Sequence, residues 1–140
     1  MAASDNLNQD QFGYRGNHHA PNATSFGAPI HNPGEMFPDI DTHPEYYSGY
    51  GDKSWDRESH SAIKAARGNP EAPVTIHRAA PKGTKDINPG DWVSTSRGYA
   101  FQHGYSNLSK GFTVLSKTVP AKEVHTNGDY IHEWGWNPKQ

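Results

Sequence analysis

The frequency of glycine and proline is the feature that most limits how this chain can fold. The 14 Gly and 11 Pro make up more than a sixth of the 140 residues, while hydrophobic residues make up only 32%. This combination predicts a compact, loop-rich domain with a poorly ordered arm. Four Trp and seven Tyr supply large contact areas, which partly offset the shortage of Leu and Ile.

The length fits a single domain. Residues 1–22 are polar and lack hydrophobic periodicity, so we expect a flexible arm. Residues 23–140 would form the folded domain, in which the apolar residues of the Pro- and Gly-rich stretch 25–51 anchor long loops. Because the chain has no Cys and no apolar run that could span a membrane, we expect a cytoplasmic protein. A net charge of −2 disfavours a large nucleic-acid footprint without forbidding contact with one flipped base.

The order of periodic segments indicates an α+β fold. Helices are predicted at 56–67, from the order of its charges, and at 97–104, with Gly104 as its stop. β-branched or aromatic runs bounded by Pro and Gly predict four strands, within 74–79, 87–96, 112–121 and 130–136. Asn127-Gly128 predicts a hairpin before the last strand. The resulting order of elements indicates a mainly antiparallel sheet.

The nine histidines do not suggest a metal site. His18-His19 falls in the predicted arm, where solvent exposure is expected. His132-Glu133 begins like the HExxH motif of zinc proteases, but Trp136 stands where the second His would be, and a strand would point neighbours to opposite faces. We therefore expect no metal.

Three polar elements lie in or beside predicted strands: Arg78, Ser94-Thr95-Ser96 and Glu133. Arg78 is either a surface ion-pair partner or a guanidinium fixed to bind a phosphate. The Ser/Thr run either caps the following helix through Ser96 or lines a pocket. Glu133, among aromatic residues, is either a surface carboxylate or a catalytic one. Singly, each has an ordinary structural explanation.

In this order, the three elements resemble the R–S–E arrangement of the ADP-ribosyltransferase superfamily. The segments VTIHRAAP, INPGDWVSTSRGYAFQHG, VPAKEV and NGDYIHEWGW are similar to its phage- and prophage-borne branch, and the resemblance spans about residues 26–137. It implies a compact, split antiparallel β-sheet with a few short helices, which binds NAD+ as a substrate. The implied activity is mono-ADP-ribosyl transfer, of phage or toxin type, to a protein or nucleic-acid acceptor.

The resemblance also implies roles for residues by position. Arg78 would contact the phosphates or adjoining ribose of NAD+, and Ser94 would orient Arg78 and the catalytic glutamate by hydrogen bonding. Thr95 and Ser96 would complete the floor of the pocket. The backbone of Ala79 would hold the nicotinamide amide.

Glu133 is implied as the catalytic residue, because a fixed carboxylate stabilises the positive charge that develops on the ribose as the nicotinamide bond breaks. The neighbouring aromatic residues would exclude water from it or stack on rings: Tyr130, Trp134 and Trp136. Nicotinamide needs a flat apolar partner, for which the candidates are Trp92, Tyr99 and Phe112.

One position departs from the family pattern. Arginine-modifying members carry Glu two residues before the catalytic glutamate, and several other members carry Gln, whereas this chain has Ile131. Strand alternation would put Ile131 on the same face as Glu133. The candidate residues of the acceptor side are Asp129, Tyr130 and Ile131. Because Ile131 cannot activate an acceptor, arginine modification is not expected. The activating group would come from Asp129, Tyr130, His132 or the acceptor itself.

Two other functions stay open. With water as the acceptor, the chain would be an NAD+ glycohydrolase. With the fold but without catalysis, it would be a nucleotide-binding or interaction module, with the loops of 26–51 as a contact surface. In each case we expect a monomer that makes no membrane contact.

Overall fold

The computed structural model describes residue 20 and residues 27–34, 36–48, 53–126, 128 and 130–138. Most of the predicted arm at 1–22 therefore lies outside the described residues, as does Asp129 of the predicted acceptor side. In the described ranges, no helix has the length and apolar character needed to cross a bilayer.

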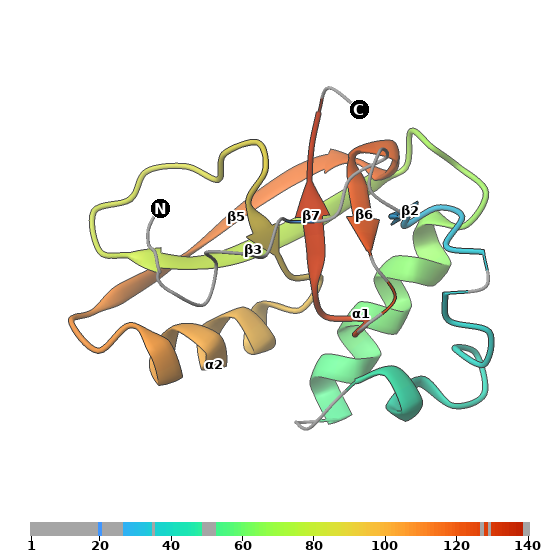
Figure 1. Ribbon diagram of the computed structural model, residues 1–140, viewed down its shortest axis with the longest axis horizontal. Coiled ribbons are helices and arrows are strands. Elements are labelled where there is room, and N and C mark those ends of the chain that lie inside the picture. The colour runs from blue at the N-terminus through green and yellow to red at the C-terminus, as the bar shows by residue number, and fades with distance from the viewer. Residues whose placement is uncertain are drawn as a thin grey trace.

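Two helices and several antiparallel strands confirm the predicted α+β class (Figure 1). The elements, with η for a 3-10 helix, are β2 (Ala28–Pro29), η2 (Pro44–Tyr47), α1 (Lys53–Ala66), β3 (Pro73–Pro81), β4 (Trp92–Val93), α2 (Arg97–Asn107), β5 (Phe112–Pro120), η3 (Ala121–Glu123), β6 (Val124–Thr126) and β7 (Trp134–Trp136).

The strands form two antiparallel sheets that meet at one bridge. β3 and β5 pair over nine residues, with Arg78 opposite Leu115. The other sheet has the order β2-β6-β7-β4, and its strands are two or three residues long. His77 of β3 and Ser94 after β4 exchange two backbone hydrogen bonds of 2.8 Å, which join the sheets. Beyond this bridge the two sheets diverge.

The helices lie against these strands (Figure 1). Their buried faces consist of small or apolar residues. α1 buries Ser59, Ile63 and Ala66, whose spacing puts them on one helix face. Ile63 belongs to a core that includes Ile76 of β3. α2 lies along β3 and β5, and α1 also contacts α2. The two helices therefore meet close to the bridge between the sheets.

The predicted end of the second helix at Gly104 is wrong, because α2 continues to Asn107. Gly104 is buried, and a Cβ there would lie 2.8 Å from the Cβ of Ala79 and still closer to the ring of Phe112. The glycine is therefore explained by the close approach of the helix to β3 and β5 and not by a helix stop.

The last strand is shorter than predicted. β6 and β7 pair antiparallel, but β6 ends at Thr126 and β7 spans only Trp134–Trp136, with a turn directly before it. The strands are therefore not joined by the tight turn predicted at Asn127-Gly128, of which Asn127 lies outside the described residues. The N–H of Ile131 donates to the carbonyl of Tyr47 at 2.8 Å, and that of Glu133 donates to the carbonyl of Tyr130 at 3.3 Å. These bonds to the end of η2 and to a turn take the place of a strand ladder, so the alternation expected at 131–135 does not hold.

The side chain of Ile131 is consequently not on the acceptor side. It is 0% exposed and belongs to the core, next to the equally buried His132. Two consecutive buried residues are possible here because a turn, unlike a strand, does not alternate its side chains between two faces. His132 is likewise excluded as a group that could activate an acceptor.

Candidate active site

The candidate residues Arg78, Ser94 and Glu133 lie on three neighbouring chain segments. β4 and β7 pair Val93 with Trp134 in antiparallel register. The next residues at the same end of that pair are therefore Ser94 on one chain segment and Glu133 on the other. Ser94 also bridges to His77, which precedes Arg78 in β3. Because neighbouring strands are spaced by about 4.8 Å, all three residues lie within roughly two strand spacings. They come together where the two sheets separate.

Arg78 occupies the point of separation. In a continued β3–β4 ladder the carbonyl of Trp92 would accept from the N–H of Ala79. Instead it accepts from Nη1 of Arg78 at 2.7 Å, while Nε of Arg78 lies 3.5 Å from Oδ2 of Asp91. The Arg78 side chain is 20% exposed, so solvent reaches it. The backbone polar groups of Ala79 face the same edge as those of His77, two residues earlier.

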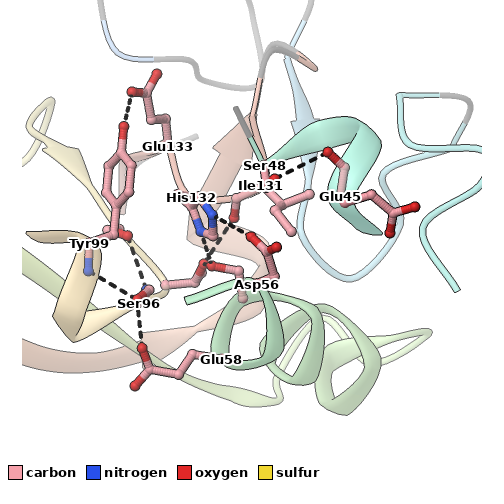
Figure 2. A network of polar contacts seen from close by, with 12 residues as sticks. Glu45, Ser48, Asp56, Glu58, Ser96, Tyr99, Ile131, His132 and Glu133 are labelled. Atoms are coloured by element: carbon pink, nitrogen blue, oxygen red, sulfur yellow. Dashed lines mark hydrogen bonds and ion pairs between the residues drawn. The ribbon is translucent and has the colours of Figure 1, made fainter. Parts of the chain in front are cut away.

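The two serines of Ser94-Thr95-Ser96 form hydrogen bonds at the start of α2, and Figure 2 shows those of Ser96. The Ser94 hydroxyl accepts from the N–H of Ser96 at 3.0 Å, a contact other than the predicted ones to Arg78 and Glu133. Ser96 Oγ accepts from the N–H of Tyr99 at 3.1 Å and donates to Glu58 at 2.6 Å. Ser96 therefore caps α2, which is one of the two roles that the sequence predicted for this Ser/Thr run.

Thr95 begins a series of buried hydrogen bonds that reaches α1; Figure 2 shows its other end at His132 and Asp56. Its hydroxyl lies 2.7 Å from Oγ of Ser59 and 3.0 Å from the carbonyl of Ile131. Ser59 Oγ lies 2.7 Å from Nδ1 of His132, and Nε2 of His132 lies 3.1 Å from Oδ1 of Asp56. These hydrogen bonds fix the turn that precedes β7, because His132 lies in that turn, directly before the candidate catalytic Glu133.

His132 is neutral in this chain of bonds. Burial lowers its pKa from the ordinary value of 6.5, and this effect outweighs the attraction of Asp56. A neutral ring that donates from Nε2 to Asp56 accepts at Nδ1 from the Ser59 hydroxyl, so each polar group has a partner. Ser59, His132 and Asp56 resemble a hydrolase triad in composition, but Ser59 is 0% exposed and no substrate reaches it. Their role is structural.

Tyr99 connects α2 directly to Glu133. Its hydroxyl donates to Oε2 of Glu133 at 2.5 Å. Its ring stacks on His132, with centroids 4.9 Å apart and planes at 25°, and meets the edge of Trp55 at 5.9 Å. Tyr99, one of the three candidates for nicotinamide stacking, is therefore placed to orient the half-buried carboxylate of Glu133.

The two other candidates for nicotinamide stacking lie in different places. Trp92 is half-buried beside Arg78, and its indole N–H is buried with no hydrogen-bond partner among the described residues. Phe112 packs against Phe101 of α2, with centroids 5.3 Å apart. It lies three residues along β5 from Leu115, the partner of Arg78, which is about 10 Å along the strand. Trp92 is at the site and Phe112 is not.

The aromatic residues around Glu133 also divide. Trp134 is 0% exposed, and its indole N–H donates to the carbonyl of Ile131 at 2.7 Å, so it is a core residue. Trp136 is buried as well, and it donates to Glu123 at 3.0 Å. Neither can form the wall of an open cleft. Tyr130 is 43% exposed, and its carbonyl accepts from the N–H of Glu133.

Sequence reasoning missed the contribution of α1. Asp56, Ser59 and Glu58 bond to the turn before β7 and to the start of α2, and Trp55 packs on Tyr99. A signal was present, because Ser59 interrupts the otherwise apolar stripe that continues with Ile63 and Ala66. A polar residue at such a position has to find a buried partner.

In the part of the chain that the structure describes, no three His, Asp or Glu side chains gather as metal ligands would. The candidate site is thus one arginine, one carboxylate with a tyrosine donor, and a set of hydroxyls that anchor its backbone. The chain matches no protein-family model, no curated protein and no solved structure.

Proposed function

We propose that this chain is an NAD+-dependent mono-ADP-ribosyltransferase with a split antiparallel sheet of the ADP-ribosyltransferase kind. The observation that carries the proposal is the convergence of Arg78, Ser94 and Glu133 on three adjacent segments, at the point where the two sheets diverge. These residues are distant in sequence, and they are the ones on which the resemblance to the R–S–E enzymes depends. The sequence pattern alone did not require them to be neighbours.

The properties of the site suit cleavage of the nicotinamide–ribose bond. When this bond breaks, its electron pair moves to the ring nitrogen, the pyridinium becomes neutral nicotinamide, and positive charge develops on the ribose carbon. The half-buried carboxylate of Glu133, oriented by Tyr99, would stabilise that charge. The acceptor then bonds to the same carbon and loses its proton to solvent or to a nearby base.

The binding groups for NAD+ would come from the edge that the diverging strands expose. Arg78, fixed by the carbonyl of Trp92, would bind a phosphate. The backbone of Ala79 on the same edge would bind the nicotinamide amide, and the ring of Trp92 is the remaining stacking candidate nearby. With Ile131 buried, Tyr130 is the described residue of the acceptor side that is exposed.

The test is nicotinamide release and label transfer. The full chain is incubated with NAD+ that carries a label on its adenylate half and with a bacterial lysate, and nicotinamide and labelled macromolecules are measured. Glu133→Gln should lower both by roughly 100-fold or more, since it removes the charge that stabilises the transition state. Glu71→Gln is the matched control, because Glu71 is exposed and pairs with Lys122 instead. Its activity should equal that of the unaltered chain.

Failure has a defined form. If the unaltered chain released no nicotinamide from NAD+ in any mixture, or if Glu133→Gln kept full activity with an unchanged fold, the proposed reaction would be wrong. Tight binding of another nucleotide, without turnover, would instead favour the non-catalytic module.

A second candidate is NAD+ glycohydrolase, which the burial of Ile131 favours. The position that activates the acceptor in related enzymes contributes no polar group here, so water would be the simplest acceptor. Nicotinamide released at the same rate with and without lysate, and lost in Glu133→Gln, is the expected result for this alternative. Release that depends strictly on an added acceptor excludes it.

A further inference from the structure

One face of α2 carries exposed aromatic and basic side chains. Arg97, Phe101 and Tyr105 follow one another at four-residue spacing, so they form a stripe along the helix. Phe101 is 49% exposed and Tyr105 is 72% exposed, and Arg97 is exposed too. The other face of the helix, with Ala100 and Gly104, is buried against β3 and β5 (Figure 1). Nothing in the described part of the chain covers the stripe.

Basic side chains extend this stripe at both ends. Beyond the helix, Lys110 is exposed, and the backbone of exposed Lys82 bonds at 3.4 Å to the residue that follows it. At the start, Arg57 and Arg97 line a shallow hollow of about 650 Å³ between α1 and α2, together with one carboxylate, that of Glu58. Among the described residues, none of these four cations forms an ion pair. We define the basic–aromatic band as Arg57, Arg97, Phe101, Tyr105, Lys82 and Lys110.

Acidic side chains are scarce near this band. Residues 92–122 include no Asp or Glu. The basic residues of that segment are Arg97, Lys110, Lys117 and Lys122. Glu58 and Glu133, at the N-terminal end of α2, accept hydrogen bonds from Ser96 and Tyr99. This face is therefore locally basic, although the whole chain has a net charge of −2.

We propose that the basic–aromatic band binds single-stranded nucleic acid, and that a nucleotide of the bound strand is the acceptor of ADP-ribose. The exposed rings offer flat faces on which unpaired bases stack, and the cations attract the intervening phosphates. In a duplex the bases stack on each other and do not reach such rings, so single strands are favoured. The statement about the acceptor rests on the proposed function, whereas the statement about binding does not.

The band leads to the candidate active site. Arg97 directly follows Ser96, whose hydroxyl caps α2, and Tyr99 two residues later donates to Glu133. From Arg97 to Tyr105 the helix rises by about 12 Å, so a segment of a few nucleotides covers it. A strand that stacks on Phe101 and Tyr105 would reach the N-terminal end of α2, where the carboxylate lies.

The first experiment measures binding without NAD+. Fluorescence anisotropy is recorded for the full chain with labelled oligonucleotides of about 12 nucleotides, as single-stranded DNA, single-stranded RNA and duplex DNA, and with labelled poly-glutamate. We expect both single strands to bind more tightly than the duplex and poly-glutamate. Whichever of the two single strands binds more tightly shows whether the surface prefers deoxyribose or ribose. With about three phosphates contacted, the logarithm of the binding constant should fall with the logarithm of salt at a slope of about −2.

Matched variants locate the binding surface. Tyr105→Ala should weaken binding of the single strand roughly tenfold, since one stacking contact is lost. Because Tyr105 is mostly exposed, this change leaves the fold intact. Tyr46→Ala removes another exposed ring, which is 61% accessible and lies on η2, and should leave the affinity for the single strand unchanged. Unaltered affinity in Tyr105→Ala, or poly-glutamate binding as tight as that of the single strands, overturns the proposal.

The second experiment adds labelled NAD+ to the preferred oligonucleotide. Label on the oligonucleotide that is lost in Glu133→Gln and reduced in Tyr105→Ala supports the assignment of the acceptor. An oligonucleotide that binds and stays unlabelled, while lysate proteins are labelled, overturns that assignment and leaves the proposed reaction standing. Binding without release of nicotinamide in any mixture refutes the reaction and supports only the binding surface.

Discussion

Arg78 and Glu133 are held in place by different kinds of interaction. Arg78 belongs to β3, in which nine consecutive residues pair with β5, and its side chain bonds to the backbone of β4. Glu133 precedes a strand of three residues, and side chains from both helices fix the turn around it. The arginine therefore depends on a backbone ladder, whereas the glutamate depends on the buried chain of Thr95, Ser59 and His132.

Because of this difference, the two sides of the site should tolerate mutation to different degrees. A regular ladder tolerates changes of single side chains, because its hydrogen bonds come from the backbone. A turn fixed by buried side chains does not, since each lost partner leaves another polar group unsatisfied. We expect the glutamate side of the site to be the more sensitive side to mutation and to pH.

The largest expected effect is that of His132→Ala. The change removes the hydrogen bonds of His132 to Ser59 and Asp56 and opens a cavity, and should lower the free energy of unfolding by about 3 kcal/mol. His77→Ala, on the β3 side, removes a half-buried ring that bonds to Ser116, and should cost less than about 1 kcal/mol. Urea titration of both variants checks the comparison. Equal losses would show that the two regions do not differ as described.

The second effect concerns the packing of α2 on β3, the strand that carries Arg78. Gly104→Ala places a methyl group against Ala79 and Phe112, and should lower the free energy of unfolding by roughly 2 kcal/mol. Ser106→Ala, exposed on the same helix, should stay within about 0.5 kcal/mol of the unaltered chain. Thermal denaturation measures both. A stable Gly104→Ala variant would mean that α2 can move away from β3 at little cost.

The third effect is on activity and assumes the proposed function. Tyr99→Phe removes the hydroxyl that donates to Glu133 and should reduce kcat for nicotinamide release about tenfold, with little change in KM for NAD+. Tyr105→Phe is the control on the same helix and should leave release without added acceptor unchanged. A higher KM with unaltered kcat would instead indicate that Tyr99 binds NAD+ directly.

The smallest effect is a dependence of stability on pH. Burial lowers the pKa of His132, and also those of His77 and His125, below the ordinary 6.5. Below pH 6.5 the unfolded chain therefore binds more protons than the folded one, and stability falls as pH falls. Melting temperatures should decline from pH 7.5 to pH 5.5, and less steeply in a His132→Asn variant. An unchanged slope in that variant would assign the effect to the other two histidines.

Local patterns predicted most of the secondary structure. The β-branched run at 74–79 and the run at 112–121 appear as β3 and β5. The helix predicted at 56–67 appears as α1, which begins three residues earlier, at Lys53, and ends at Ala66. These predictions succeeded because strand and helix periodicity act over a few residues. The helix end predicted at Gly104 was wrong because a glycine required by a neighbouring strand looks the same in sequence as one that ends a helix.

The turn before β7 shows where sequence reasoning fails. YIHEWGW has the composition of a strand, but the N–H of Ile131 bonds to Tyr47, more than 80 residues away along the chain. No local propensity reports such a partner. The same is true of Ser59 and Asp56 on α1, whose role appears only when His132 is packed against them.

The sequence by itself determined the α+β class and the two long strands, because these follow from periodicity. Arg78, Ser94-Thr95-Ser96 and Glu133 were selected as candidates by resemblance to the R–S–E enzymes, and they remain a prediction. The tertiary structure decided that the sheets separate at Arg78, that Tyr99 bonds to Glu133 and that Ile131 is buried. Those outcomes depend on which distant groups satisfy each buried hydrogen bond. That choice is made by packing of the whole chain, so it is not encoded in any short segment.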